Sequence, residues 1–164
     1  MGDPKSAEHA RALSLVPRGM FVMASAFDGS RAGILVSWAQ RCATEPPLIA
    51  VAVRKGRPIE PIIRDSRAFA LSLVDPRDTF IRKKLAESDE HAGGVLDALA
   101  CETLKTGSPC LTRAVAAFDC AVERHLDIEA DHEMYIGLVV GSKIYDEAAA
   151  AGHIGSQTDW PRAG

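Results

Sequence analysis

The chain has 164 residues, 47% of them hydrophobic and 25% charged, and a formal net charge of −3. This length and composition indicate one globular domain that buries roughly two thirds of its unfolded surface. The small negative charge gives no general attraction to nucleic acid or to an acidic membrane surface, so any site for an anion has to be local.

The N-terminal part of the chain is expected to form a helix followed by a hairpin. Alanine and leucine among charged residues predict a short helix from Pro4 to Leu13, packed against the main body. Met20 to Phe27 is apolar and typical of a strand. Asp28-Gly29 is a strong hairpin turn before the next apolar run, which starts at Ala32. The first two strands should therefore pair.

The next segments alternate strands with short helices. Leu48 to Val53 follows two prolines, which cannot donate to a ladder, and reads as a fully buried third strand. Isoleucines at helical spacing predict a helix from Pro58 to Asp65, and a strand from Ala68 to Val74 follows it. Asp75-Pro76 offers an N-cap and a first-turn proline for a further helix that ends at about Glu87.

The remaining segments are a loop, two long strands and a tail. Ser88 to Gly94 is charged and ends in two glycines, which predicts a solvated loop or, alternatively, a lid over a ligand. Ala114 to Ile128 and Met134 to Ile144 are strand-like and should form a closing hairpin. A short helical turn from Ala148 to Ala151 then precedes a polar tail, Gly155 to Gly164.

Strands that come in bursts, with few helices between them, predict a mainly β fold. They argue against an alternating parallel α/β fold and for a small β-barrel with peripheral α-helices. We divide the chain into an N-terminal helical extension (residues 1–15), the barrel domain (16–154) and the polar C-terminal tail (155–164).

Neither a disulfide framework nor a metal site is expected. The four cysteines are scattered without a Cys-x-x-Cys pair, and His125 and His132 are separated by six residues, which matches no common ligand spacing. The N-terminus lacks the apolar segment of a signal peptide, and no run reaches the roughly 20 apolar residues that cross a bilayer. These features predict a cytoplasmic protein.

The stretch from Gly33 to Gly56 is the candidate binding site. An apolar strand leads through two prolines to a second apolar strand, which ends in a loop with three cations: Arg54, Lys55 and Arg57. Main chain, apolar side chains and cations in this order could hold flavin mononucleotide (FMN), with the cations at its phosphate. The alternative is an ordinary hairpin with solvated surface cations.

This stretch resembles the signature of the flavin reductase-like, FMN-binding split-barrel family. The likeness continues in order through Pro61 to Ser66, Phe69 to Leu71 and Asp131 to Gly137. The residues that carry it in the first stretch are Gly33, Val36, Ser37, Pro46, Pro47, Val51, Val53, Lys55 and Gly56. The resemblance implies a six-stranded Greek-key split barrel, and a homodimer with the flavin in a groove at the interface.

The resemblance also implies roles for individual residues. The backbone from Leu35 through Val36 and Ser37 to Trp38 would meet the pyrimidine edge of the flavin, with the Ser37 hydroxyl as a further hydrogen-bonding group. Trp38 stands where a second serine is more usual, and it could shape the pocket or lie in the core. His132, the candidate catalytic residue, matches a histidine that lies beside the flavin or receives the nicotinamide; the alternative is a surface histidine in an acidic turn.

The function that follows is an NAD(P)H-dependent flavin oxidoreductase, in which hydride passes from the nicotinamide to flavin N5. FMN is the expected cofactor, with FAD possible, and NADH or NADPH is the electron donor. Reduced flavin or electrons would pass to a monooxygenase component or an electron-acceptor protein. Two alternatives remain open at this point: a flavin-binding electron-transfer protein without nicotinamide turnover, and a cofactor-free dimeric scaffold.

Overall fold

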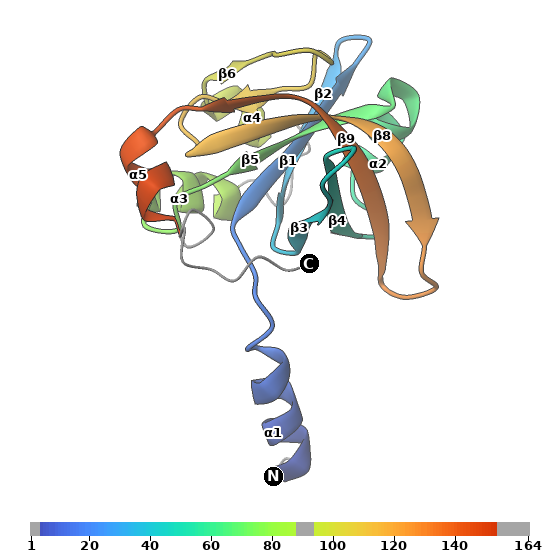
Figure 1. Ribbon diagram of the computed structural model, residues 1–164, viewed down its shortest axis with the longest axis vertical. Coiled ribbons are helices and arrows are strands. Elements are labelled where there is room, and N and C mark those ends of the chain that lie inside the picture. Colours follow the sequence, from blue (N-terminus) through green and yellow to red (C-terminus); the bar gives the residue numbers. More distant parts are fainter. Residues whose placement is uncertain (1–3, 88–93, 154–164) are drawn as a thin grey trace.

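The computed structural model describes residues 4–87 and 94–153 and is mainly β, as predicted (Figure 1). Its main sheet has seven strands in the order β2-β1-β5-β8-β9-β4-β3, with antiparallel neighbours throughout, and β6 and β7 form a small second sheet. The strands are β1 (Phe21–Phe27), β2 (Ser30–Val36), β3 (Ala39–Ala43), β4 (Leu48–Arg54), β5 (Ala68–Leu73), β6 (Cys101–Glu102), β7 (Cys110–Leu111), β8 (Ala116–Asp127) and β9 (His132–Ile144). The helices are α1 (Pro4–Leu13), α2 (Ile59–Ser66), α3 (Thr79–Glu87), α4 (Gly94–Ala98) and α5 (Glu147–Gly152).

The two edge strands of the main sheet, β2 and β3, are joined by only two residues. The Ser37 carbonyl accepts from the Gly19 amide at 3.0 Å, on the β1 side, and the Trp38 carbonyl accepts from the Ala52 amide at 2.9 Å, in β4. β2 and β3 are thus one bent strand that pairs with β1 before the bend and with β4 after it. Counted in this way the sheet has six strands and closes on itself, which confirms the six-stranded barrel. A separate strand β3 was not predicted.

Turn chemistry fixes the register of the first hairpin. Asp28 and Gly29 have φ angles of 48° and 79°, the left-handed conformation that a two-residue hairpin turn requires. They bring Phe27 opposite Ser30, and the β1–β2 ladder runs from there to Val36. The predicted hairpin is therefore confirmed, as is the long antiparallel hairpin of β8 and β9.

The main core fills the barrel, and α2 covers one end of it. Ile59 and Ile63 of α2 are fully buried in the same apolar cluster as Met23, Val51 and Phe69 of the strands. Burying an isoleucine side chain contributes about 1.5–3 kcal/mol, so these two residues hold α2 against the barrel. The chain segment just before α2 is thereby fixed relative to the sheet.

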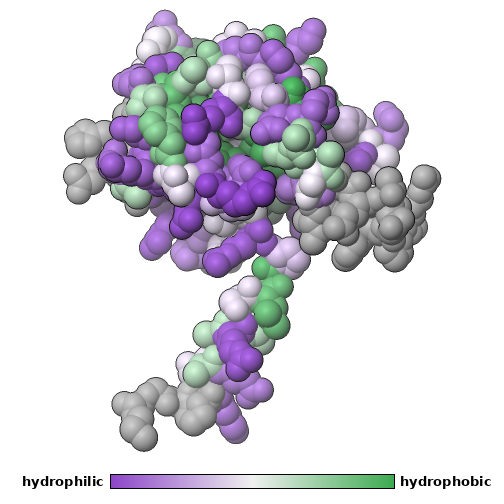
Figure 2. All heavy atoms as spheres, turned by 90° about the vertical axis from the view of Figure 1, so that its left-hand side faces the viewer, coloured by the Kyte–Doolittle hydropathy of each residue, from purple (hydrophilic) through white to green (hydrophobic). Residues whose placement is uncertain are grey.

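The helix α1 has the predicted bounds but does not pack against the barrel. The side chains of residues 5–18 are exposed, and α1 projects away from the barrel (Figures 1 and 2). Alanine dominates the apolar residues of α1, and it offers little area to bury. The larger apolar residues, Leu13, Leu15 and Val16, follow at its end and are 58%, 80% and 57% exposed.

The helix α3 begins later than predicted. Asp78, not Asp75, caps it, with Oδ1 accepting from the amides of Phe80 and Ile81 at 3.1 and 3.2 Å. The Asp75 carboxylate instead accepts from the Arg77 amide at 2.9 Å, a local turn that competes with the helix. The loop predicted from Ser88, up to residue 93, and the tail predicted from Gly155 lie outside the described residues.

All four cysteines are free thiols. Cys110 and Cys120 are buried, and burial raises the pKa of each thiol to about 12, whereas Cys42 is exposed. None of the helices in the described residues has the length and apolar character needed to cross a membrane.

Candidate functional site

A pocket of about 310 Å³ lies against the β2–β3 bend; we call it the bend pocket. It is formed by the bend itself, the end of β4 with the loop after it, and the start of β9. Seven of the eight predicted site residues line it: Leu35, Val36, Ser37, Trp38, Arg54, Arg57 and His132. The remaining lining residues are Arg18, Ile34 and Ala52.

One wall of the bend pocket is apolar and open to solvent. Leu35 is 46% exposed and Trp38 is 51% exposed, whereas the Val36 side chain between them points into the barrel core. The Trp38 ring lies 5.0 Å from the His132 ring, at an interplanar angle of 51°. Trp38 is therefore not a core residue. Two large apolar side chains left open beside cations are typical of a ligand site.

The cations lie where β4 turns into α2. Arg54 is the last residue of β4, and Gly56 takes a φ of 79°, which turns the chain toward α2. Arg57 follows and is partly buried, and its amide donates to Glu60 Oε1 at 2.8 Å. Because the Glu60 carboxylate already occupies this amide, a bound anion would have to be met chiefly by the guanidinium groups.

Lys55 is the one predicted site residue that does not line the bend pocket. Its ammonium lies 2.6 Å from Asp127 Oδ1, at the end of β8. Successive side chains of an extended chain point to opposite sides, so Lys55 and Arg54 diverge at the end of β4. The Lys55–Asp127 pair holds the pKa of Asp127 below its ordinary value, through the hydrogen bond from Lys55.

His132 is the first residue of β9 and lies opposite Arg54 in the ladder. Its Nδ1 is 2.8 Å from Asp131 Oδ1, and a carboxylate can only accept, so Nδ1 carries the proton. This hydrogen bond is the main reason that the pKa of Asp131 lies below its ordinary value. Asp131 thereby fixes the tautomer of the ring and leaves Nε2 for other partners.

Arg18 lines the bend pocket, and the sequence did not point to it. It lies in the exposed segment between α1 and β1, and the β1 pairing brings this segment beside Ser37. No local pattern marks an arginine before a strand as a ligand. Only the sheet order, with β1 next to β2, could have indicated its position.

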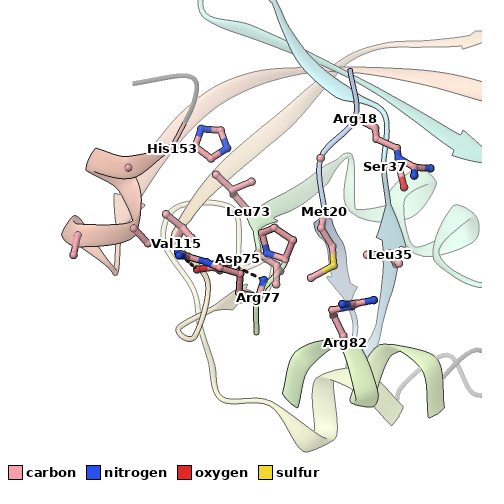
Figure 3. Close-up of a pocket in the computed structure, with 16 residues that line it drawn as sticks. Arg18, Met20, Leu35, Ser37, Leu73, Asp75, Arg77, Arg82, Val115 and His153 are labelled. Atoms are coloured by element: carbon pink, nitrogen blue, oxygen red, sulfur yellow. Dashed lines mark hydrogen bonds and ion pairs between the residues drawn. The ribbon is translucent and has the colours of Figure 1, made fainter. Parts of the chain in front are cut away.

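A larger pocket of about 830 Å³ adjoins the bend pocket and shares Arg18, Leu35 and Ser37 with it; we call it the α3 pocket (Figure 3). Arg82 reaches into it from α3, and His153 lies at the end of α5. Within it, Arg77 forms a two-point ion pair with Asp75, at 2.8 and 3.0 Å. This pair lowers the pKa of Asp75 through the Arg77 hydrogen bonds.

A family model described as "Flavin reductase like domain" matches residues 13–158 of this chain. The chain therefore belongs to the flavin reductase-like family, which confirms the resemblance found in the sequence. The structure also resembles the crystal structure of nitrilotriacetate monooxygenase component B from Mycobacterium thermoresistibile, with a TM-score of 0.74 and 18% identity over 87% of this chain and 78% of that one.

Two curated relatives illustrate the range of proteins that share this sequence pattern. A putative diflavin flavoprotein from Synechocystis is 24% identical over 92% of this chain and 26% of its own length. A ferric-chelate reductase (NAD(P)H) from Archaeoglobus fulgidus is 25% identical over 79% of this chain and 78% of its own length. The chain spans about a quarter of the length of the curated relatives that it matches first.

Proposed function

We propose that this chain binds FMN in the bend pocket and reduces it with NADH or NADPH. One observation supports this above the others. Side chains from β2, β4 and β9, which are far apart in the sequence, line one pocket that is apolar on one side and cationic on the other. Membership of the flavin reductase-like family supports the same activity.

The residues of the bend pocket fit the two chemically distinct parts of FMN. An isoalloxazine ring has broad apolar faces, and the exposed parts of Leu35 and Trp38 offer a matching surface. The phosphate is a dianion, and Arg54 and Arg57 line the same pocket. Arginine suits this role because its planar fork can donate to two phosphate oxygens at once. FAD carries the same ring and could enter the same site.

Each residue would then have a defined task. The main chain from Leu35 to Trp38 would meet the pyrimidine edge of the ring, and the Ser37 hydroxyl would add a hydrogen bond. When bound, the flavin supplies the acceptor for a hydride from the nicotinamide. That transfer requires no acid, base or covalent nucleophile from the protein, so the chief task of the chain is to hold donor and acceptor at about 3–3.5 Å.

His132 is the proposed positioning group beside the ring. Its Nδ1–H donates to Asp131, so its Nε2 can accept from a ligand or, in the charged form, donate to one. The tilted contact with Trp38 holds the imidazole against the apolar wall. In this role His132 orients a ligand and can hold a proton at Nε2 without taking part in the hydride step.

We also propose that the chain works as a homodimer. A mainly apolar surface pocket of about 660 Å³ is lined by residues that include Phe21, Leu48, Ile49 and Phe118, and the exposed apolar residues at the end of α1 lie outside the barrel. Apolar surface on this scale favours contact with another protein. Light scattering at micromolar concentration should give about twice the 17.5 kDa mass of the chain, and a stable monomer would contradict the proposal.

Further parts of the proposal concern the setting of the chain. The acceptor of the reduced flavin would be a monooxygenase component or an electron-acceptor protein. The names of relatives support these options, since they include a monooxygenase component and diflavin flavoproteins.

The division into a helical extension (1–15), barrel domain (16–154) and tail (155–164) agrees with the projecting α1. A cytoplasmic location agrees with four free thiols.

Spectroscopy tests the proposed activity. The purified chain should bind added FMN and become yellow. Without oxygen, NADH or NADPH should bleach the absorbance of the bound flavin. In air, the chain should oxidise many equivalents of the nicotinamide. A chain that binds FMN without oxidising either nicotinamide would be an electron-transfer protein. A chain that stays colourless with added FMN would be a scaffold, and the proposed site would be wrong.

A further inference from the structure

The α3 pocket contains two arginines whose charge is not already neutralised. Within residues 4–87 and 94–153, neither Arg18 nor Arg82 has a carboxylate partner. Arg77 in the same pocket is different, because both of its contacting nitrogens are held by Asp75. A large pocket with two unneutralised guanidinium groups favours a ligand with more than one anionic group.

We propose that the α3 pocket holds the adenosine half of the nicotinamide dinucleotide and that Arg82 recognises the 2′-phosphate, which NADPH has and NADH lacks. The inference rests on the proposed function and names the donor that the chain prefers, NADPH. It assigns the specificity to a residue outside the flavin site.

The position of the α3 pocket is the first support. A nicotinamide that reduces a flavin has to lie on the ring, and the ring would lie against Leu35 with its polar edge at Ser37. These two residues, with Arg18, form the wall that the bend pocket and the α3 pocket share. The rest of the dinucleotide can therefore continue directly into the α3 pocket, whose volume of about 830 Å³ is ample for an adenosine and its phosphates.

The placement of the two arginines is the second support. Arg18 lies at the junction of the pockets, where the diphosphate between the two nucleosides would pass. Arg82 comes from α3, on the opposite side of the pocket from Arg18 and Ser37 (Figure 3). Met20 lies between the two arginines, and Leu73 and Val115 line the pocket on the side toward His153; these apolar side chains suit an adenine face (Figure 3).

Arg82 is also the only cation of α3 without an acidic partner in the described part of the chain. Lys83 and Lys84 both pair with Glu87, at 4.0 and 3.4 Å. Ile81, next to Arg82, is fully buried, and it sets the rotation of the helix. The Arg82 guanidinium can therefore donate two strong hydrogen bonds to the 2′-phosphate of a bound NADPH.

The start of α3 is anchored as well. Asp78 caps the helix and also accepts from Arg113, with Nε 2.6 Å from Oδ2. The Arg113 hydrogen bond holds the pKa of Asp78 below its ordinary value, so the carboxylate stays charged at neutral pH. Arg82 therefore stands on a helix whose N-terminal turn is fixed, as a specificity residue requires.

The test compares two substitutions on the same helix. Arg82→Gln should lower the ratio of kcat/KM for NADPH to kcat/KM for NADH by about tenfold. The reason is that losing a charge-assisted hydrogen bond to the 2′-phosphate weakens the interaction with NADPH, and not with NADH, by about this factor. Arg82→Lys should keep part of the preference. Lys83→Gln removes a charge from α3 outside the pocket and should leave the ratio within about twofold of the original.

A binding measurement keeps the inference separate from turnover. By calorimetry, 2′,5′-ADP should bind the original chain about tenfold more tightly than 5′-AMP, and Arg82→Gln should remove this difference. Equal binding of the two nucleotides, or a preference that survives Arg82→Gln, would overturn the assignment even if flavin reduction is normal. If Arg82→Gln lowers the affinity for FAD but not for FMN, the assignment is also overturned, because the α3 pocket would then hold the adenylate part of FAD. A chain that oxidises neither nicotinamide would instead overturn the proposed function, and this inference with it.

Discussion

Replacing both Arg54 and Arg57 with alanine is expected to raise the Kd for FMN by about a hundredfold. Both side chains line the bend pocket, and each guanidinium can make charge-assisted hydrogen bonds to a phosphate, so that losing each one costs about 1.4 kcal/mol or more. Titration of FMN followed by quenching of flavin fluorescence measures the change. Thermal unfolding of the variant shows whether the barrel remains intact.

Two comparisons show whether the loss comes from the phosphate. Riboflavin has the same ring without the phosphate, so the double substitution should change its Kd by less than about threefold. Lys55→Ala should have a smaller effect on FMN than the double substitution, because the Lys55 ammonium lies on Asp127 and outside the pocket. Equal losses for FMN and riboflavin would show that the arginines support the pocket rather than bind the phosphate.

Gly137→Ala is expected to lower the free energy of unfolding by about 2 kcal/mol. A Cβ at this position would lie 2.6 Å from Phe69 Cζ and 2.7 Å from Cys120 Cβ, and both of these residues are fully buried. Overpacking a rigid core costs about 1–3 kcal/mol, and here two neighbours would have to move. Replacing a glycine lowers the conformational entropy of the unfolded chain, and this offsets only about 0.5–1 kcal/mol. Urea unfolding measures the loss.

Gly141→Ala on the same strand is the matched control. Its Cβ would meet the Lys105 side chain at 3.1 Å, and a flexible lysine can move aside. We expect this substitution to change the free energy of unfolding by less than about 1 kcal/mol. A similar loss for both variants would mean that glycine is required for the backbone of β9 and not for the contact with Phe69.

Much of the fold could be predicted because local signals and packing agree. The positive-φ turn at Asp28-Gly29 identifies the first hairpin, and the isoleucines of α2 follow the helical period that buries them. Strand β3 was missed because its sequence, AQRCA, is mostly exposed and carries no alternating pattern. Its structure depends on pairing with β4, which the local sequence does not reveal.

The site was predicted in outline, and its limits follow from geometry. The sequence pattern pointed to the residues from Leu35 to Trp38 and to the cationic loop, because both lie within one short stretch of the chain. The direction of each side chain could not be predicted, so Lys55 was included although it points to Asp127. The order of the strands places Arg18 in the α3 pocket, and the rotation of α3 places Arg82 there. Both are properties of the packed chain rather than of any short motif.

A crystal structure of the chain grown with FMN shows whether the bend pocket holds the flavin. We expect the phosphate between Arg54 and Arg57, with the ring against Leu35 and Trp38. FMN bound elsewhere, with this pocket empty in the same crystal, would contradict this expectation.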